Sequence, residues 1–271
     1  MLKTRIIPTL LWKNLGLVKG VGFDSWRRVG TLLPAIRVYN TRQVDELILV
    51  DITATSESRD PDLETIGEIS SECFVPFTVG GGIKSTEDIK GLLRAGADKV
   101  AINSAAFQNP ELISQGAKMF GSQCIVASID AKKNSKGQYF CYSHSGTKNE
   151  HIEASQWAKK VEALGAGEIL ITSIERDGTM KGYDLDLIRL VTKTVSIPVI
   201  ASGGAGNYED FYRAIQTGKA QAVAAASIFH YTQQTPMEAK HYLNDKGIPV
   251  RINRVILSSN SNEGVKADFA R

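Results

Sequence analysis

Two glycine-rich stretches of this 271-residue chain are suited to binding phosphate. The first, Gly80-Gly81-Gly82, follows an apolar run and precedes Ser85, a residue type that often caps helices. Glycine lets the backbone approach a ligand closely, and the N–H groups of a turn or helix start attract anions. A second stretch, Ser202-Gly203-Gly204, has the same arrangement. The pattern predicts two phosphate-binding loops, with tight turns between strand and helix as the alternative explanation of the glycines.

The two loops belong to an internal repeat. Gly203 lies 122 positions after Gly81, and at the same offset Glu168 matches Glu46. A substrate held by both loops would be long and phosphorylated at both ends. The chain is therefore predicted to contain two related halves, about 1–122 and 123–253.

Composition indicates a globular protein without a strong charge bias. With 32 Lys and Arg against 29 Asp and Glu, the net charge of +3 is too small to favour nucleic acid or an anionic membrane as partner. No apolar run approaches the ~20 residues of a membrane span, and the first residues lack a secretory signal. Three cysteines without paired spacing favour reduced thiols and a cytoplasmic protein, and Cys124 is expected in the core. The four histidines form no metal-ligand pattern, so neither a metal nor a cofactor is expected.

Eight short apolar runs alternate with amphipathic stretches of helical length. Continuous apolar runs are typical of parallel strands that are covered on both faces. Eight such units in about 250 residues predict an α/β fold, a single (βα)8 TIM barrel built from two half-barrels over 1–253. A doubly wound open sheet is the alternative, but it would not readily give the duplication. The polar segment 254–271 is predicted to be disordered and outside the fold. The predicted strands are Ile6–Leu11, Leu47–Asp51, Phe74–Val79, Lys99–Asn103, Cys124–Asp130, Ile169–Ser173, Pro198–Ser202 and Ala222–Ala226.

In such barrels the chemistry lies at the carboxyl ends of the strands. Asp130 ends the fifth strand there and is a candidate general acid or base, with a structural carboxylate as the alternative. The match between the halves places Leu11 at the corresponding position, and Leu11 cannot transfer a proton. Lys19 falls in a long loop after the first strand, which is predicted to be a lid over the site.

Four charged residues stand at strand beginnings: Arg5, Glu46, Lys99 and Glu168. Two cations and two anions at the amino-terminal mouth of one barrel could form a closed ring of ion pairs. Ordinary solvation at the ends of strands is the alternative. Because a buried ring is costly unless fully paired, a gating role is one reason to keep it.

These features together resemble the cyclase subunit of imidazole glycerol phosphate synthase (HisF), over roughly residues 1–253. The matching stretches include Leu-Val-Asp-Ile-Thr-Ala at 49–54, Pro-Phe-Thr-Val-Gly-Gly-Gly-Ile at 76–83, Arg-Asp-Gly-Thr at 176–179 and Ile-Ala-Ser-Gly-Gly-Ala-Gly at 200–206. The related phosphoribosyl isomerase shares the barrel and the glycine loops, but it matches the charged strand beginnings less well.

The resemblance implies a complex with a HisH-like glutaminase, which docks on the amino-terminal face with Asp98 and Gln123 expected at the interface. Ammonia would cross the four-residue gate, pass Thr78 and reach a bis-phosphorylated ribulosyl substrate at the other face. Asp130 would be one of two catalytic aspartates. The residues expected to bind the substrate and its phosphates are Lys19, Asp51, Gly82, Asn103, Ser104, Asp177, Gly178, Gly203, Gly204, Ala226 and Ser227.

The chain departs from this family at the other catalytic aspartate. Where the family has Cys-Leu-Asp-Val-Lys-Asp-Gly, residues 9–16 read Thr-Leu-Leu-Trp-Lys-Asn-Leu-Gly, so Leu11 replaces the aspartate. Losing one of two proton-transfer groups ordinarily costs orders of magnitude in rate.

Three functional hypotheses follow from this departure. The first is an ammonia-delivering subunit for amide or amidine formation on a surface-polysaccharide sugar, working with a glutaminase and a third, ligase-like protein. The second is an ordinary imidazole glycerol phosphate synthase subunit in which Asp51 or Asp177 compensates for Leu11. The third is a barrel that only binds and activates a glutaminase.

Overall fold

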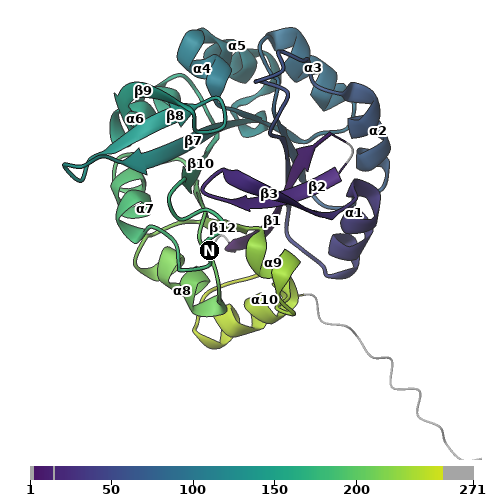
Figure 1. Cartoon of the computed structure of the whole chain (residues 1–271), viewed down its shortest axis with the longest axis vertical. Helices are drawn as coiled ribbons and strands as arrows, with labels where there is room; N and C mark the ends of the chain where they lie inside the picture. Colours follow the sequence, from purple (N-terminus) through teal and green to yellow (C-terminus); the bar gives the residue numbers. More distant parts are fainter. Residues whose placement is uncertain (1–2, 15, 253–271) are drawn as a thin grey trace, which may run out of the picture.

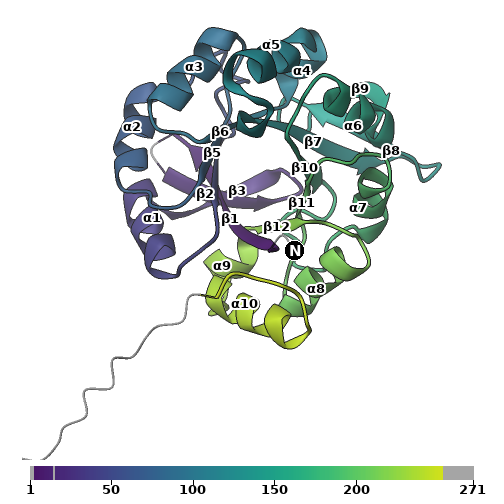
Figure 2. The same ribbon diagram turned by 180° about the vertical axis from the view of Figure 1, so that it is seen from behind.

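The computed structural model describes residues 3–14 and 16–252, so the predicted tail at 254–271 lies outside the described residues. Eight parallel strands pair side by side, and the pairing of β10 with β7 closes them into a barrel. Helices surround the barrel in both end-on views (Figure 1, Figure 2). The predicted (βα)8 barrel is therefore confirmed. The barrel strands are β1 (Arg5–Lys13), β4 (Leu47–Asp51), β5 (Phe77–Gly80), β6 (Lys99–Ile102), β7 (Ile125–Lys133), β10 (Glu168–Ser173), β11 (Val199–Ser202) and β12 (Ala222–Ala225).

Ten α-helices and one short 3-10 helix lie in the connections of the described residues. Their apolar sides pack on the outward-facing side chains of the strands, and this layer holds most of the buried core, including Ile6, Leu10, Phe77 and Phe211. The helices are α1 (Leu32–Thr41), α2 (Leu63–Ser71), α3 (Thr86–Arg94), α4 (Ser104–Gln108), α5 (Glu111–Phe120), η1 (Ser122–Cys124), α6 (Ala154–Ala163), α7 (Leu185–Thr192), α8 (Tyr208–Gln216), α9 (Ser227–Tyr231) and α10 (Pro236–Asp245).

Side chains that point into the barrel form stacked layers, because successive residues of a strand face opposite sides. On β1 the inward residues are Arg5, Ile7, Thr9 and Leu11, from the amino end to the carboxyl end. The middle layer is apolar and separate from the outer core. It consists of Ile7, Ile48, Ala101, Val126, Leu170, Ile200, Ala222 and Ala224.

Two β-hairpins extend the barrel strands at the carboxyl-terminal mouth. The first, β2 (Gly16–Val21) with β3 (Asp24–Gly30), pairs with β1 and crosses the front of the barrel (Figure 1). The second, β8 (Tyr139–Ser143) with β9 (Lys148–Glu153), continues from β7. The prediction of a loop around Lys19 is therefore wrong, since residues 16–30 fold as an antiparallel hairpin.

Two further local predictions are corrected. The third strand begins at Phe77 rather than Phe74, because Pro76 has no N–H to donate to a ladder and the Phe74 side chain is 80% exposed. Cys124 is not a core residue of a strand. It lies in the short helix η1 and is partly exposed, as the chain turns into β7.

Candidate functional site

The carboxyl ends of the barrel strands surround one cavity with an empty volume of about 1240 Å³, part of it open to solvent. All twelve residues predicted for catalysis or substrate binding line this cavity. They are Lys19, Asp51, Gly82, Asn103, Ser104, Asp130, Asp177, Gly178, Gly203, Gly204, Ala226 and Ser227. Three buried polar atoms in its wall, Thr9 Oγ1, Asn103 Oδ1 and Ser227 Oγ, have no hydrogen-bond partner among the described residues. Since buried polar groups are normally paired, these atoms are available to a ligand.

The two glycine loops have matching backbone geometry. Gly81 and Gly82 have φ values of 106° and 74°, and Gly203 and Gly204 have 86° and 115°. A Cβ on Gly81 would lie 2.2 Å from the carbonyl oxygen of Asp51, so no larger residue fits there. The helices that follow, α3 and α8, both begin with a capping box. Each half of the barrel thus presents a glycine turn to the cavity, and the backbone N–H groups of such turns suit an anion.

Asp130 is placed and tuned for proton transfer. Asn103 Nδ2 donates a hydrogen bond of 2.7 Å to Asp130 Oδ2. Burial and the nearby charge of Asp177 raise the pKa of Asp130 to about 7, although hydrogen bonds from Asn103 and Thr172 oppose the rise. A carboxyl group with this pKa can give or accept a proton near neutral pH.

The β2–β3 hairpin closes over the mouth through contacts that the sequence did not predict. Lys19 Nζ lies 2.5 Å from Asp177 Oδ2, and the Lys19 side chain is almost fully buried. The backbone N–H of Gly22 donates a hydrogen bond to the carbonyl oxygen of Asp177. The Tyr231 hydroxyl donates one to the carbonyl oxygen of Lys19. Lys19 and Asp177 therefore form a buried salt bridge with each other. A ligand phosphate would have to compete with Asp177 for Lys19. The hairpin also adds Phe23 and Trp26 to the cavity wall.

The four charged strand beginnings form a closed ring at the amino-terminal end of the barrel. Arg5 is 2.7 Å from Glu46 and 2.6 Å from Glu168, and Lys99 is 3.0 Å from Glu46 and 2.9 Å from Glu168. Thr78 Oγ1 also donates to Glu46, at 2.8 Å. The ring therefore alternates in sign and every member is paired. The apolar layer of the barrel separates it from the cavity.

Charge pairing has a larger effect than burial on the pKa values of Arg5 and Glu168 in the ring. Burial alone would lower the pKa of Arg5, but Glu168 and Glu46 raise it. Burial would raise the pKa of Glu168, but Arg5 and Lys99 lower it. Both residues are therefore held in their charged forms.

Comparison with known proteins identifies the family. The family model described as "Histidine biosynthesis protein" matches residues 5–235. The chain is 51% identical to "Imidazole glycerol phosphate synthase subunit HisF" of Dehalococcoides mccartyi, over 93% of this chain and 99% of the relative. It is 49% identical to the subunit of the same name from Chlorobaculum tepidum, over 93% of this chain and all of the relative. The chain belongs to the HisF family.

In this member of the HisF family an apolar side chain lies at the carboxyl end of β1. Leu11 lines the cavity and pairs in register with Val50 of β4 and with Val18 of β2. Asp130 lies at the matching place on β7, where it pairs with Thr172 of β10. The cavity therefore has Asp130 on β7 and an apolar side chain at the matching place on β1.

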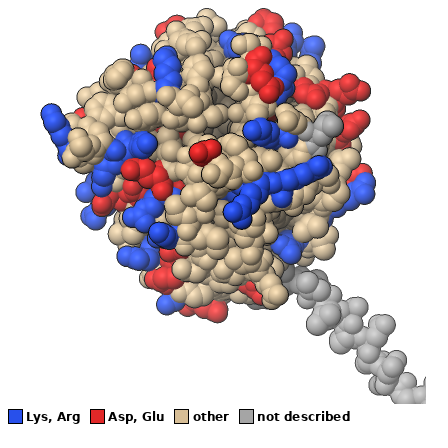
Figure 3. All heavy atoms as spheres, viewed as in Figure 1, with Lys and Arg blue, Asp and Glu red and all other residues tan. Residues whose placement is uncertain are grey.

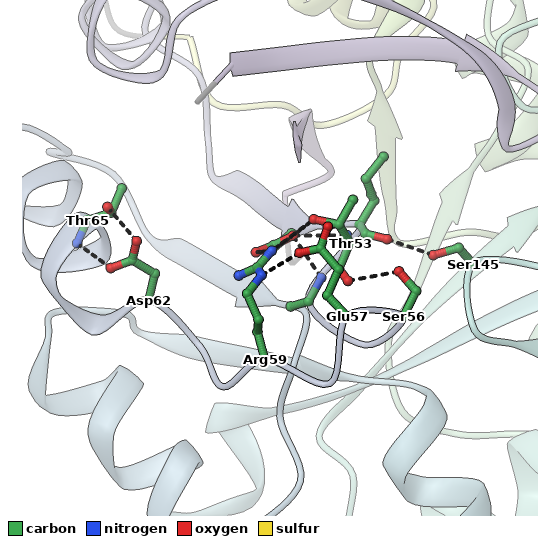
Figure 4. Close-up of polar contacts among 10 residues, drawn as sticks. Thr53, Ser56, Glu57, Arg59, Asp62, Thr65 and Ser145 are labelled. Carbon is green, nitrogen blue, oxygen red and sulfur yellow. Dashed lines mark hydrogen bonds and ion pairs between the residues drawn. The ribbon is translucent and has the colours of Figure 1, made fainter. Parts of the chain in front are cut away.

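Asp51 holds a turn through contacts with Thr53, Ala54 and Arg59, and Figure 4 labels Thr53, Glu57 and Arg59 of this network. Its Oδ1 accepts hydrogen bonds from the backbone N–H groups of Thr53 and Ala54 and from the Thr53 hydroxyl, at 2.9 to 3.0 Å. Its Oδ2 pairs with the guanidinium of Arg59 at 3.1 Å, and Arg59 in turn binds Glu57. These contacts favour a structural role for Asp51. Asp177 is similarly engaged, by Lys19.

The residues predicted for the partner interface lie at the amino-terminal face. Asp98 and Gln123 are exposed, just before β6 and β7 respectively. Asp98 also accepts a hydrogen bond of 2.8 Å from the backbone N–H of Phe77, which the sequence did not indicate. Any test of Asp98 in binding therefore needs a control variant that preserves this hydrogen bond.

Other site classes find no support in the part of the chain that the structure describes. Residues 3–14 and 16–252 contain no group of three or more His, Cys, Asp or Glu side chains that could hold a metal ion. None of the described helices is both long and apolar enough to cross a membrane. Figure 3 shows positive and negative side chains interspersed around the face that carries the mouth, rather than one continuous positive field.

The raised pKa of Asp130 predicts a pH-dependent effect of Asp130→Asn on stability. Below the ordinary pKa of 3.8 the group is protonated in both states. As pH rises to about 7, only the unfolded chain releases the proton, so the native state loses stability relative to it. The difference between a pKa of 3.8 and one of about 7 limits this loss of stability to roughly 4 kcal/mol.

We expect Asp130→Asn to raise the free energy of unfolding by about 2–4 kcal/mol at pH 8 and to leave it nearly unchanged near pH 4. Urea denaturation of both proteins at the two pH values measures this difference. An equal effect at pH 4 and pH 8 would contradict the raised pKa.

Proposed function

We propose that this HisF-family barrel is the synthase-side subunit of a glutamine-dependent complex and that its main task is to conduct ammonia. A HisH-like glutaminase would dock on the amino-terminal face, and ammonia would cross the ring of Arg5, Glu46, Lys99 and Glu168 and move past Thr78. We propose that the nitrogen is used in the cytoplasm for amide or amidine formation on a surface-polysaccharide sugar, with the help of a third, ligase-like protein.

The observation that carries this proposal is that Leu11 lines the cavity while the charged ring at the other end of the barrel is complete. The ring is fully paired, with Glu46 only 2% exposed, although buried ion pairs are costly to maintain. Retention of a costly ring supports a task that needs it. The cavity, in contrast, lacks a proton-transfer group on β1, while Asp51 and Asp177 are both engaged.

The glycine loops support a phosphorylated ligand at the mouth. They lie in opposite halves of the barrel wall and both open into the one cavity. The orphaned Asn103 Oδ1 and Ser227 Oγ lie in the same wall. These features are difficult to reconcile with a barrel that only activates a glutaminase.

The names of the relatives support a second candidate, imidazole glycerol phosphate synthase activity in histidine biosynthesis. Complementation separates it from our proposal. We expect the gene to fail to restore growth to a histidine auxotroph that lacks its own cyclase subunit, whereas a HisF gene from a histidine pathway restores growth. Growth with this gene would overturn the proposal. In the native host, deletion should leave histidine synthesis intact and remove amide or amidine nitrogen from the surface polysaccharide.

Asp98 offers a test of the partner. We expect Asp98→Lys to weaken activation of the co-purifying glutaminase by about tenfold or more, because it reverses a charge at the proposed interface. Asp98→Asn is the matched control, since it can still accept the hydrogen bond from Phe77 N. Circular dichroism checks that both variants remain folded. Unchanged activation in Asp98→Lys would remove this residue from the interface.

A further inference from the structure

The amino-terminal face presents an unusually exposed aromatic side chain. Phe74 is 80% exposed, the highest value of any large apolar side chain in the described residues, and Met119 follows at 58%. Phe74 lies in the connection from α2 to β5, and Met119 lies in the last turn of α5 before β7. Isolated exposed apolar residues are common. Here, however, the two most exposed ones lie at the end of the barrel where the ring opens.

The backbone that carries Phe74 is held in place. Its N–H donates to Asn40 Oδ1 at 3.2 Å, and Asn40 Nδ2 donates to the carbonyl oxygen of Glu72 at 2.5 Å. Arg37 makes two further hydrogen bonds to the Glu72 carboxylate. On the other side, Leu47 N donates to the carbonyl oxygen of Pro76. A side chain on a fixed backbone loses little conformational freedom on binding, which favours affinity.

The segment that carries Phe74 is also linked to the ring by hydrogen bonds. Leu47, which binds Pro76, directly follows the ring residue Glu46, and Thr78 of β5 donates to Glu46. A joint that passes neutral ammonia into this ring has to exclude water, because water would protonate the ammonia or let it escape. Apolar contacts around the opening meet that need better than charged ones.

We propose that Phe74 is the anchor of the glutaminase interface and inserts into an apolar pocket of that partner. The inference rests on the proposed function, because the occupant is the subunit that supplies ammonia. Aromatic side chains that fill a partner's pocket commonly dominate binding energy. A second copy of this chain is the competing occupant.

The test compares Phe74→Ala and Phe74→Asp with Leu63→Ala. Leu63 is 43% exposed and lies at the other end of α2, so it controls for loss of an exposed apolar side chain. The probe is the purified glutaminase that co-purifies with the full chain, titrated by calorimetry. We expect Phe74→Ala to raise Kd at least tenfold, Phe74→Asp to raise it further and Leu63→Ala to leave it unchanged. Melting temperatures should match the wild type, since Phe74 packs little.

Each outcome decides the inference. Equal Kd values for the wild type and Phe74→Ala would overturn the anchor while leaving the proposed function in place. Failure of any glutaminase to bind the wild-type chain would overturn both. A dimer of the chain alone that depends on Phe74, seen by sedimentation, would assign this surface to a second copy instead.

Discussion

Leu11→Asp is expected to raise the cyclase activity of this barrel far above that of the wild type. Leu11 lines the cavity at the carboxyl end of β1, opposite a half-barrel that carries Asp130 at the matching position. An aspartate there would restore the second proton-transfer group. Because such a group contributes typically 10²–10⁴-fold, we expect at least a ~100-fold gain in imidazole glycerol phosphate formation. The assay supplies the ribulosyl histidine precursor and ammonium salt and follows the product.

Leu11→Asn is the matched control for this gain. It has nearly the shape of aspartate and can hydrogen-bond, but it cannot transfer a proton. We expect Leu11→Asn to remain at the wild-type level. An equal gain in cyclase activity for Leu11→Asn and Leu11→Asp would show that proton transfer at position 11 does not cause the gain.

Glu46→Ala is expected to cause the largest loss of stability among single changes in the ring. Glu46 is 2% exposed and accepts hydrogen bonds from Arg5, Lys99 and Thr78. Removal of the Glu46 carboxylate leaves Arg5 and Lys99 with only Glu168 as an anionic partner in the ring. Removing one member of a buried ion pair costs about 3–5 kcal/mol, and we expect a loss of that size in urea denaturation at pH 7.5.

Glu72→Ala provides the comparison, because Glu72 pairs with Arg37 on the exposed surface. Exposed ion pairs contribute little to stability, so this variant should be nearly as stable as the wild type. Glu46→Gln should fall between the two, since it keeps the shape and some hydrogen bonds. A loss below about 1 kcal/mol in Glu46→Ala would show that the ring is not an interdependent buried unit.

Much of the barrel could be predicted because its strands are continuous apolar runs that are buried on both faces. Leu47–Asp51 has the same bounds in the sequence prediction and in the structure. The start of β5 was misplaced because Phe74 and Val75 are apolar, and hydrophobicity alone does not show that Phe74 faces solvent. The β2–β3 hairpin was missed because its residues pair with each other over the mouth rather than in a covered parallel sheet.

The composition of the site could be predicted from position, but its internal contacts could not. The carboxyl ends of parallel strands converge, so Asp130, Asn103 and the glycine loops had to share one mouth. Which side chains pair is decided by long-range geometry. Lys19 and Asp177 are 158 residues apart, and no local pattern links them. The Asp51 network depends on how one turn folds back on itself, which sequence spacing alone did not show.

The ratio of product formed to glutamine hydrolysed tests the central claim most directly. The purified complex of this chain with its glutaminase would receive glutamine and the ribulosyl histidine precursor, and both reactions would be followed together. We predict that glutamine is hydrolysed while the ratio of imidazole glycerol phosphate to glutamate stays near zero. A ratio near one would show that the barrel with Leu11 is a working cyclase, which would contradict the account.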